Sequence, residues 1–367
     1  MHLAHLRLRD FRNYARLDAE FSPGFHLLLG DNAQGKTNIL ESIYLMATLR
    51  SFRGVGGAQM IRHGAKGYFV GGNVVGQDGH EIKIYWSARE RKLALDGQPV
   101  KRLANYFGAL RAVVFCTEDL QLVKGVARSR RRFMDLLLAQ TQPGYLPLLQ
   151  RYTRAVRNRN ALLKQSRHGG MDEAALESFS AELVKLGGDI IRSRRELAPK
   201  FSPLARLAYR RISNDAEELR IEYQPSVKND FAVELAQSRA RERSCRFTLV
   251  GPHRDDLQLL LNEKSAAQFG SEGQKRTLAV ALKMAQAEFL AGLHGSPPVL
   301  LIDDVMGELD AKRRGGLLPL LGQARKSGGQ VFMTATGENW PRELGKDLER
   351  WEVKAGTLEK ISKSDIQ

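Results

Sequence analysis

The sequence predicts an α/β protein built on a mixed sheet, with an α-helical region inserted into it. Three observations carry this prediction. The stretch GDNAQGKT, at residues 30–37, lies between a short apolar run and a segment with helical periodicity. A second apolar run, PVLLIDD at residues 298–304, ends in two carboxylates. Between these stretches, residues 128–212 have the apolar spacing of helices and separate two regions of strand-like pattern.

The first stretch has the strand, loop and helix order of a phosphate-binding loop. Its glycines allow a tight turn that brings backbone N–H groups onto phosphate oxygens, and the following helix start favours an anion. We expect Lys36 to reach the β- and γ-phosphates of ATP, and the Thr37 hydroxyl to hold Mg²⁺. The predicted nucleotide-binding residues are Gly30, Asp31, Asn32, Ala33, Gln34, Gly35, Lys36 and Thr37.

Two carboxylates follow the second apolar run. We expect a buried strand to deliver Asp303 beside the phosphate loop, where it would hold Mg²⁺ together with Thr37. Asp304 then stands where a carboxylate orients or deprotonates the attacking water. The alternative is an ordinary strand that ends in an acidic turn. The presence of the phosphate loop favours the nucleotide site, with Lys36, Asp303 and Asp304 as the predicted catalytic residues.

The stretch FGSEGQKR, at residues 269–276, opens another helical pattern. Ser271 followed by Gln274 fits a capping box, which is the simpler interpretation. In ATPases with this order of motifs, the helix start covers the γ-phosphate bound to a second molecule, and a serine hydroxyl with free N–H groups suits that role. The sequence therefore predicts Ser271 as a nucleotide contact in an ATP-dependent homodimer, with the GELD loop at residues 307–310 at the same interface.

The charge of the chain is unevenly distributed. The formal net charge is +16, and residues 124–213 hold 19 Lys and Arg against 7 Asp and Glu. Such a concentration predicts a polyanionic partner, most simply nucleic acid. The alternative is a solvated helical surface whose charge is incidental.

Composition narrows the class of protein. The 367 residues, 43% of them hydrophobic, suffice for a large core and two lobes. No segment approaches the apolar length of a membrane span, and the N-terminal stretch lacks an apolar signal core. The two cysteines, Cys116 and Cys245, lie far apart and form no metal-ligand pair. We therefore expect a cytoplasmic protein with no membrane partner.

We expect residues 1–125 and 246–367 to form the nucleotide-binding lobe, and residues 126–245 to form an inserted helical arm. Strands are predicted at residues 15–21, 82–86, 247–250 and 257–261, with hairpin turns at Asp78-Gly79 and Asp96-Gly97. Residues 166–170 read as a turn. A helix over residues 172–198 carries a short coiled-coil seam that Gly187 and Gly188 weaken, formed by Leu176, Phe179, Leu183, Leu186 and Ile190.

Together these stretches make the chain resemble the RecF family of bacterial DNA repair ATPases, which is related to SMC and ABC-type ATPase heads. The resemblance covers residues 1–340. Besides the phosphate loop and the strand-end acids, the stretches that carry it are LRDFRNY at 8–14, RSFR at 50–53, EDLQLVKG at 118–125, RRRFMD at 130–135 and GPHRDDL at 251–257.

The resemblance implies an ABC-type P-loop ATPase head that dimerises on ATP and binds double-stranded DNA at gaps or junctions. It further implies a weak, DNA-stimulated ATPase that acts with RecO and RecR to help RecA replace single-strand-binding protein, in repair, recombination and the SOS response. In this family the basic middle segment would contact DNA phosphates, with little sequence preference.

Three positions depart from the pattern of transporter ATPases. Glu272 replaces a glycine and puts a carboxylate near a γ-phosphate; Asp304 replaces a longer glutamate, which suggests slow hydrolysis; and Thr334 or Thr336 stands where many relatives have a switch histidine. Other assignments stay open. Glu118 aligns loosely with a Mg²⁺-sensing glutamine, and His253 is either a nucleotide or partner contact or a hydrogen-bonded turn residue. For Arg130, Arg131 and Arg132 we favour phosphate contacts, with the cluster Arg151, Arg154, Arg157 and Arg159 nearby.

Three alternative functions use the same loop. The ATP-binding subunit of an ABC-type transporter would need an apolar docking surface for a membrane partner. A small-molecule kinase would need neither the helix at 271 nor a dimer. In a scaffold with a structural nucleotide, DNA would not stimulate ATP loss.

Overall fold

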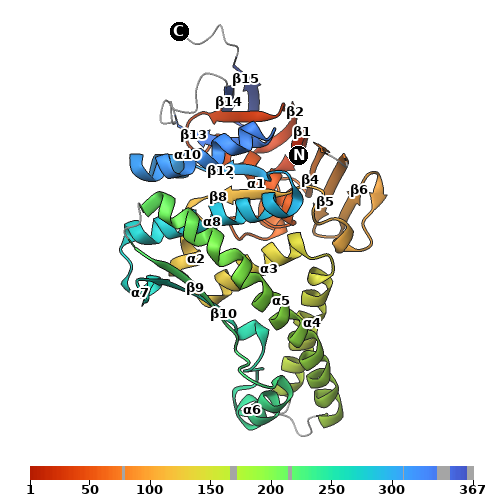
Figure 1. Cartoon of the computed structure of the whole chain (residues 1–367). Helices are drawn as coiled ribbons and strands as arrows, with labels where there is room; N and C mark the ends of the chain where they lie inside the picture. Colours follow the sequence, from red (N-terminus) through yellow and green to blue (C-terminus); the bar gives the residue numbers. More distant parts are fainter. Residues whose placement is uncertain (77–78, 166–171, 214–216, 309, 337–347, 362–367) are drawn as a thin grey trace. The chain divides into compact units, whose positions relative to one another are not determined.

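The computed structural model describes residues 1–76, 79–165, 172–213, 217–308, 310–336 and 348–361. The chain divides into two compact units (Figure 1). Unit 1 takes the described residues within 1–120, 207–216 and 276–367, and unit 2 takes those within 121–206 and 217–275. The expected lobes, divided at 125/126 and 245/246, stay a prediction. By contacts, residues 246–275 belong to unit 2.

A six-stranded mixed sheet forms the centre of unit 1, in the order β15-β14-β3-β13-β12-β8. The five strands from β14 to β8 run parallel, and β15 pairs antiparallel with β14. Apolar runs such as VLLI and AVVF are fully buried, as expected of strands covered on both faces. The strands are β3 (Gly24–Leu29), β8 (Ala112–Phe115), β12 (Val299–Ile302), β13 (Gln330–Ala335), β14 (Leu348–Lys354) and β15 (Thr357–Lys360).

A second, antiparallel sheet in unit 1 has the order β2-β1-β4-β5-β6-β7. The predicted strands at 15–21 and 82–86 are confirmed as β2 and β5. The turn at Asp96-Gly97 is also confirmed, since both residues have positive φ and join β6 to β7. Asp78 lies outside the described residues. The bounds are β1 (His2–Phe11), β2 (Tyr14–Glu20), β4 (Gly67–Val75), β5 (His80–Ser87), β6 (Arg91–Leu95) and β7 (Gln98–Pro99).

The helices of unit 1 include α1, which follows the phosphate loop directly, and most of α8. Helix α1 is buried along most of its length because it packs on the parallel sheet. The helical segments are α1 (Lys36–Thr48), η1 (Gly57–Met60), η2 (Leu103–Asn105), η3 (Thr117–Leu120), α8 (Glu272–His294), α9 (Val305–Glu308) and α10 (Ala311–Lys326).

Unit 2 combines helices with a small antiparallel sheet, β11-β10-β9. The strand predicted at 257–261 is confirmed as β10, whose partner β9 the sequence patterns did not indicate. The elements are α2 (Gln121–Lys124), α3 (Ala127–Thr141), α4 (Tyr145–Gln165), the part of α5 (Glu173–Ser213) up to residue 206, β9 (Leu219–Gln224), α6 (Phe231–Cys245), η5 (Pro252–Arg254), β10 (Asp256–Leu261), β11 (Lys264–Ser265) and α7 (Ala266–Phe269).

The strand predicted at residues 247–250 is wrong. These residues have no regular structure, because side chains satisfy their backbone donors. The Thr248 N–H donates to Asn160 Oδ1 over 2.7 Å, and the Leu249 N–H donates to Glu242 Oε1 over 2.7 Å. An apolar run whose N–H groups bind side chains has no need of a strand partner.

Helix α5 confirms the predicted apolar seam but not its predicted end. Leu176, Leu183, Leu186 and Ile190 are buried, whereas the helix continues beyond residue 198 to Ser213 with two prolines inside it. Proline costs a helix about 3 kcal/mol. Buried side chains between and beyond the two prolines continue the apolar stripe and offset this cost; they are Phe201, Ala205, Ala208 and Tyr209.

The glycine in the middle of α5 has a packing role. A Cβ atom on Gly187 would lie 2.5 Å from the Phe231 ring and 3.1 Å from the Tyr152 ring. The absence of a side chain therefore lets α5 pack closely against Phe231 and Tyr152. The sequence pattern indicated only that this glycine weakens the seam. The turn predicted at residues 166–170 lies outside the described residues.

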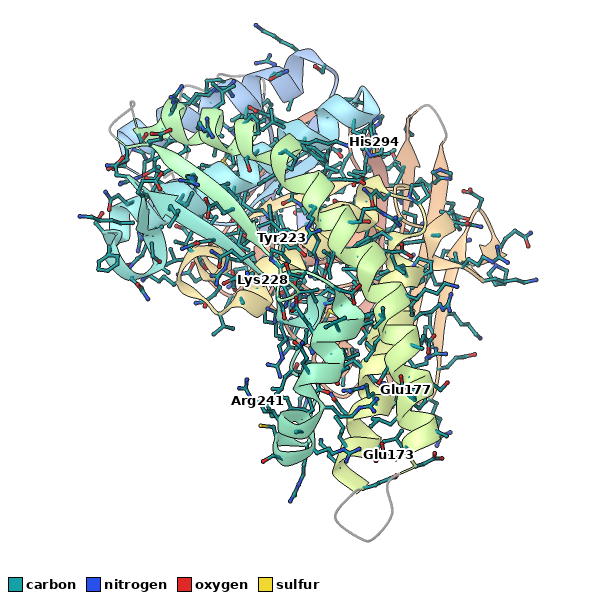
Figure 2. All side chains as sticks on the ribbon, turned by 60° about the horizontal axis from the view of Figure 1, so that its bottom comes forward. Glu173, Glu177, Tyr223, Lys228, Arg241 and His294 are labelled. Carbon is teal, nitrogen blue, oxygen red and sulfur yellow. The ribbon has the colours of Figure 1, made fainter. Side chains whose placement is uncertain are left out.

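Helix α6 is tied to the beginning of α5 by two surface ion pairs. Arg243 contacts Glu173 over 2.6 Å, and Arg239 contacts Glu177. Both acids lie in the first turns of α5 (Figure 2). These basic side chains of unit 2 are therefore partly neutralised within the chain.

Candidate functional site

The phosphate loop joins β3 to α1 and requires glycine at both ends. Gly30 has φ +151° and Gly35 has φ +121°. A Cβ atom on Gly30 would lie 2.3 Å from the Val353 carbonyl oxygen, and one on Gly35 would lie 2.7 Å from the Asn13 side chain. Such contacts exclude any side chain. The loop is thus a tight backbone cradle, as the sequence predicted.

The ammonium of Lys36 lies inside this cradle. Its Nζ donates to the carbonyl oxygens of Gly30 over 2.7 Å and Asp31 over 2.9 Å, and the residue is only 4% exposed. The positive charge therefore occupies the loop's concave side, where it meets the N-terminus of α1. This arrangement suits a phosphate group.

Two turns that sequence reasoning missed brace the loop. The Asn13 amide, in the β1–β2 turn, donates to the Gln34 carbonyl over 2.7 Å, and Asn38 donates to Asn13 Oδ1 over 2.8 Å. From the β14–β15 turn, the Ala355 N–H donates to Gln34 Oε1 over 2.7 Å. The only sequence signal for these contacts was the family-like stretch at 8–14, which contains Asn13 but gives no indication that it binds the phosphate loop.

A cluster of four polar side chains lies where β12 and β13 meet α1. The Thr37 hydroxyl donates to Asp303 Oδ1 over 2.8 Å. The Thr334 hydroxyl lies 3.1 Å from both Asp303 Oδ1 and Asp304 Oδ1, and it accepts the Asp304 N–H over 2.9 Å. Since β3, β13 and β12 are adjacent parallel strands, their carboxyl ends bring these residues together.

Burial, together with the neighbouring Asp304, raises the pKa of Asp303 to about 6, against the opposite effect of the hydrogen bonds from Thr37 and Thr334. The environment therefore favours a nearby cation. In the part of the chain that is described, no group of three or more His, Cys, Asp or Glu forms a metal cage. A hydroxyl with one carboxylate fits Mg²⁺, which keeps water and phosphate oxygens as its other ligands.

Asp304 differs from its neighbour in two ways. Its side chain is exposed, and its backbone has φ +54°, a left-handed conformation rare outside glycine. A residue held in this region at the end of a buried strand stores strain that functional sites often contain. Of the two threonines considered for the switch position, Thr334 contacts both carboxylates and is buried.

The stretch at residues 50–53 reaches the same site through a buried acid. Arg12 Nε and Nη2 donate to the Glu41 carboxylate, each over 2.7 Å, and the Ser51 hydroxyl also donates to it. Arg53 donates to Asn38 over 3.3 Å and opposes the rise in the pKa of Asp303. This network fixes the segment after α1 beside the phosphate loop.

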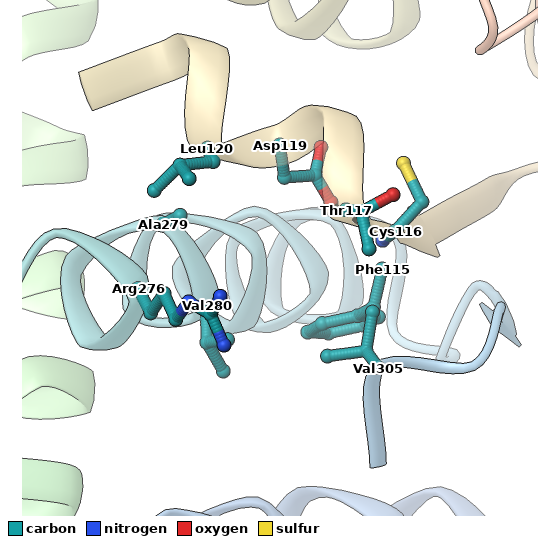
Figure 3. Close-up of a pocket in the computed structure, with 9 residues that line it drawn as sticks. All are labelled: Phe115, Cys116, Thr117, Asp119, Leu120, Arg276, Ala279, Val280 and Val305. Carbon is teal, nitrogen blue, oxygen red and sulfur yellow. Dashed lines mark hydrogen bonds between the residues drawn. The ribbon is translucent and has the colours of Figure 1, made fainter. Parts of the chain in front are cut away.

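A cavity of about 210 Å³ lies where β8 ends (Figure 3). Asp119 points toward it, whereas Glu118 does not line it. Asp119 also lies 3.6 Å from Lys283 of α8 and accepts the Cys116 N–H over 2.9 Å, so this acid and base are a buried pair. The lining residues are Phe115, Cys116, Thr117, Asp119, Leu120, Arg276, Ala279, Val280 and Val305.

The capping box at the start of α8 is present. The Gln274 N–H donates to Ser271 Oγ over 3.2 Å, and the Ser271 N–H donates to Gln274 Oε1 over 2.6 Å. Next to Ser271, the Glu272 carboxylate accepts a hydrogen bond from Lys124. The helix start therefore presents a hydroxyl, a carboxylate and an ammonium together.

Arg130 and Arg131, for which we favoured phosphate contacts, both bind groups within the chain, and their contact with DNA stays a prediction. Arg130 binds both carboxylate oxygens of Asp256, over 2.7 and 2.9 Å, and Arg131 donates to the Asp255 carbonyl over 2.6 Å. Arg159 is also occupied, since it is fully buried against Glu242. Internal partners take these charges, so a count of arginines overstates the charge available to DNA.

The stretch at residues 251–256 holds unit 2 together. Asp255 is fully buried and accepts hydrogen bonds from Arg194, Tyr223 and the Ser226 N–H. Arg194 is 2% exposed and also binds Asp135 over 2.8 Å. This motif is therefore a structural junction between α3, α5 and β9.

The open assignment of His253 resolves to a hydrogen-bonded turn residue. Its Nε2 lies 3.1 Å from the Thr248 carbonyl and its Nδ1 lies 2.7 Å from the Tyr152 hydroxyl. A carbonyl only accepts, so Nε2 carries the proton and Nδ1 accepts from Tyr152. Burial lowers the pKa of His253 to about 4.

A basic stripe remains on α4. The helix contains no Asp or Glu. Arg154, Arg157 and Lys164 are exposed, and no ion pair occupies them within the described residues. Their spacing of three and seven residues places them along one side of the helix. We name these three residues the α4 stripe.

The fold and the phosphate loop define the class. The family model of the RecF/RecN/SMC N terminal domain matches residues 2–349. A Pyrococcus furiosus Smc head domain has 15% identity and a TM-score of 0.57 over 98% of this chain and 96% of its own, which shows the fold alone. The protein therefore has the fold of an ABC-type P-loop ATPase head, with an additional helical unit.

Closer relatives narrow the class. The DNA replication and repair protein RecF of Symbiobacterium thermophilum is 38% identical over 98% of each chain, and that of Thermosynechococcus vestitus is 39% identical over 100% of this chain and 99% of its own. A structure of the recombination mediator protein RecF with ATP, in the RecFOR pathway, is 31% identical with a TM-score of 0.89 over 98% of each chain. The chain belongs to the RecF family.

Within the described ranges, no helix has the length and apolarity needed to cross a bilayer.

Proposed function

We propose that this protein is an ATP-dependent DNA-binding repair protein that dimerises on ATP and binds duplex DNA at gaps or junctions. The observation that carries the proposal is the contact of the Thr37 hydroxyl with Asp303 beside the Lys36 cradle. A hydroxyl, a carboxylate and an ammonium at one helix N-terminus are the groups that Mg²⁺ and a triphosphate require. The RecF–ATP structure among the relatives supports ATP as the nucleotide.

In the proposed reaction, the loop's N–H groups and Lys36 hold the β- and γ-phosphates of ATP. Thr37 and Asp303 would hold Mg²⁺, which would neutralise charge on the phosphate oxygens. Asp304, exposed and adjacent, orients the attacking water. Its short side chain and its hydrogen bond with Thr334 favour a slow ATPase, which suits a switch better than a motor.

Dimerisation is proposed from the beginning of α8. Ser271 caps this helix, and the Glu272–Lys124 pair beside it is partly exposed. A capped helix N-terminus attracts anions. We propose that Ser271 of one copy closes over the γ-phosphate bound to the other, so that two ATP molecules join two copies.

Duplex DNA is proposed to bind the α4 stripe. Exposed basic side chains without an internal partner contact phosphates and give salt-dependent, sequence-independent affinity. Because Arg130 and Arg131 bind groups within the chain, the proposed DNA surface holds fewer basic residues than composition alone suggested. The RecFOR pathway named for the relative's structure supports RecO and RecR as partners. Help in loading RecA is the outcome that we propose for this partnership.

Lys36→Ala tests the ATP-driven dimer. We expect a folded monomer that no longer dimerises with ATP in sedimentation experiments, while the parent forms dimers with ATP and not with ADP. Normal ATP-induced dimers in the variant would contradict the proposal. The alternative, a transporter subunit, predicts no salt-sensitive binding of duplex DNA by the isolated protein.

A further inference from the structure

The first residue of α8, Glu272, poses an electrostatic problem for the proposed dimer. A carboxylate next to Ser271 would repel the γ-phosphate that this helix start is proposed to cover. Two ammonium groups lie beside it. Lys124 Nζ donates to Glu272 Oε2, and Lys275 Nζ lies 4.0 Å from Glu272 Oε1. Lys124 comes from α2, far from α8 in the sequence, so its presence is a property of the fold.

The pair faces solvent, as a ligand contact requires. The Glu272 side chain is 63% exposed, and that of Lys124 is 34% exposed. Lys275 is only 12% exposed, so Lys124 is the more accessible ammonium beside Ser271. A phosphate group that approaches this surface is therefore exposed to the charges of both Glu272 and Lys124.

A fixed turn holds Lys124 in place. Arg130 Nη1 donates to the carbonyl of Gly125 over 2.8 Å, while its other nitrogens bind Asp256. A Cβ atom on Gly125 would lie 2.4 Å from the Gln121 carbonyl oxygen, which shows how tightly α2 ends. Arg130 therefore anchors the turn that carries Lys124, and little ordering is needed when an anion arrives.

We propose that Lys124 is a positioning residue for ATP-dependent dimerisation, an inference that rests on the proposed function. It holds the Glu272 carboxylate and neutralises its charge beside the γ-phosphate bound to the second copy. The Lys124–Glu272 pair thus lets a helix start that carries an acid still attract a triphosphate.

Two roles for the pair make opposite predictions. If it only ties α2 to α8, Lys124→Ala and Glu272→Gln each break the tie and weaken the dimer alike. If Lys124 screens the carboxylate, removing the lysine exposes a repulsive charge, whereas removing the carboxylate does not. The double variant Lys124→Ala/Glu272→Gln then regains the affinity that the single lysine variant loses.

The experiment is analytical ultracentrifugation of the full-length protein with ATP and with ADP. We expect Lys124→Ala to weaken the ATP dimer about tenfold, or ~1.4 kcal/mol. Glu272→Gln should dimerise as well as the parent or better, and the double variant should return to within about twofold of it. Arg243→Ala, which breaks a similarly exposed pair with Glu173, is the matched control and should change nothing.

Equal weakening by the two single variants, or normal dimers of Lys124→Ala, would overturn the inference while leaving the proposed function in place. Failure of the parent protein to dimerise with ATP would instead overturn the proposed function, and the inference with it. Thermal unfolding without nucleotide, unchanged in Lys124→Ala, separates the loss of the screening charge from a damaged fold.

Discussion

Thr37 and Asp303 are 266 positions apart in the sequence, and the Thr37 hydroxyl donates to Asp303 Oδ1 over 2.8 Å. This contact joins the phosphate loop to the end of β12. Burial at this site disfavours the ionised form of Asp303. A cation between the carboxylate and a triphosphate would stabilise the ionised form and so offset the cost of burial. The Mg²⁺ site is therefore the part of the proposal most open to a stability measurement.

Asp303→Asn is expected to stabilise the protein and to weaken its nucleotide site. Burial raises the pKa of Asp303 from 3.8 to about 6, so the stability linked to its protonation is complete below 3.8 and is lost as pH rises through about 6. At pH 7 the asparagine should add about 1–3 kcal/mol to the free energy of unfolding. Denaturant unfolding at pH 5 and 7 measures this difference.

The same variant should lose Mg²⁺-dependent ATP affinity by about tenfold or more, since an amide is a poorer Mg²⁺ ligand than a carboxylate. ATP titrations with Mg²⁺ and with a chelator provide the comparison. If the Mg²⁺ dependence of Asp303→Asn equalled that of the parent, Asp303 would not be a metal ligand.

Gly30→Ala is expected to disrupt the phosphate loop. The new Cβ would lie 2.3 Å from the Val353 carbonyl oxygen on a backbone with φ +151°. Strain of this kind costs about 1–3 kcal/mol, and the loop must move to relieve it. ATP affinity should therefore fall by at least about tenfold. Gly56→Ala, where a Cβ meets nothing within 4 Å, should leave it unchanged. Equal affinities for the two variants would refute the cradle geometry.

His253 makes unit 2 sensitive to acid. Because burial lowers its pKa to about 4, the stability it provides is present above its ordinary pKa of 6.5 and is lost as pH falls toward 4. Between pH 7 and pH 5, the loss should be about 2 kcal/mol. Hydrogen exchange of backbone amides in α4 and β10 at the two pH values measures it.

His253→Gln isolates this effect from other histidines. The variant should be less stable at pH 7 because it loses the hydrogen bonds with Tyr152 and Thr248, but the stability of unit 2 should depend less on pH between 7 and 5. A pH dependence as steep as that of the parent protein would place the sensitivity elsewhere.

The triple variant Arg154→Gln/Arg157→Gln/Lys164→Gln tests the α4 stripe. Each phosphate contact contributes about 0.9 to the slope of log K against log salt, so the slope should fall by about 2–3. Fluorescence anisotropy with a labelled duplex, at several salt concentrations in the presence of ATP, gives the slope. ATP-induced dimers should form normally.

The matched control carries the same loss of charge at another place. Arg89, Lys101 and Arg102 are exposed residues of unit 1, and their replacement by glutamine should leave the slope unchanged. Equal slopes for both triple variants would mean that net charge, and not the α4 stripe, determines DNA affinity.

The sequence predicted the parts of the site that follow from local patterns. A strand, a glycine loop and a helix placed Lys36 and Thr37, and an apolar run ending in acids placed Asp303, because adjacent parallel strands bring their carboxyl ends together. Ser271 and Gln274 formed the expected capping box because their partner lies only three residues away.

The sequence could not reveal contacts between distant polar groups. Asn13 reaches Gln34 across two elements, and no spacing rule relates them. Arg130 was assigned to DNA because a charge count does not show its partner, Asp256, 126 positions away. The apolar run at 247–250 predicted a strand, because an apolar pattern does not show that a distant side chain such as Glu242 will accept its backbone N–H groups.

The most direct test of the central claim is duplex-DNA binding by the full protein with ATP, with ADP and without nucleotide, across a range of salt. We predict tight DNA binding only in the presence of ATP, with an affinity that falls steeply as salt rises. Binding with ADP or without nucleotide should be weak. Equal affinity in all three states would contradict the account, since closing the nucleotide site would then have no link to holding DNA.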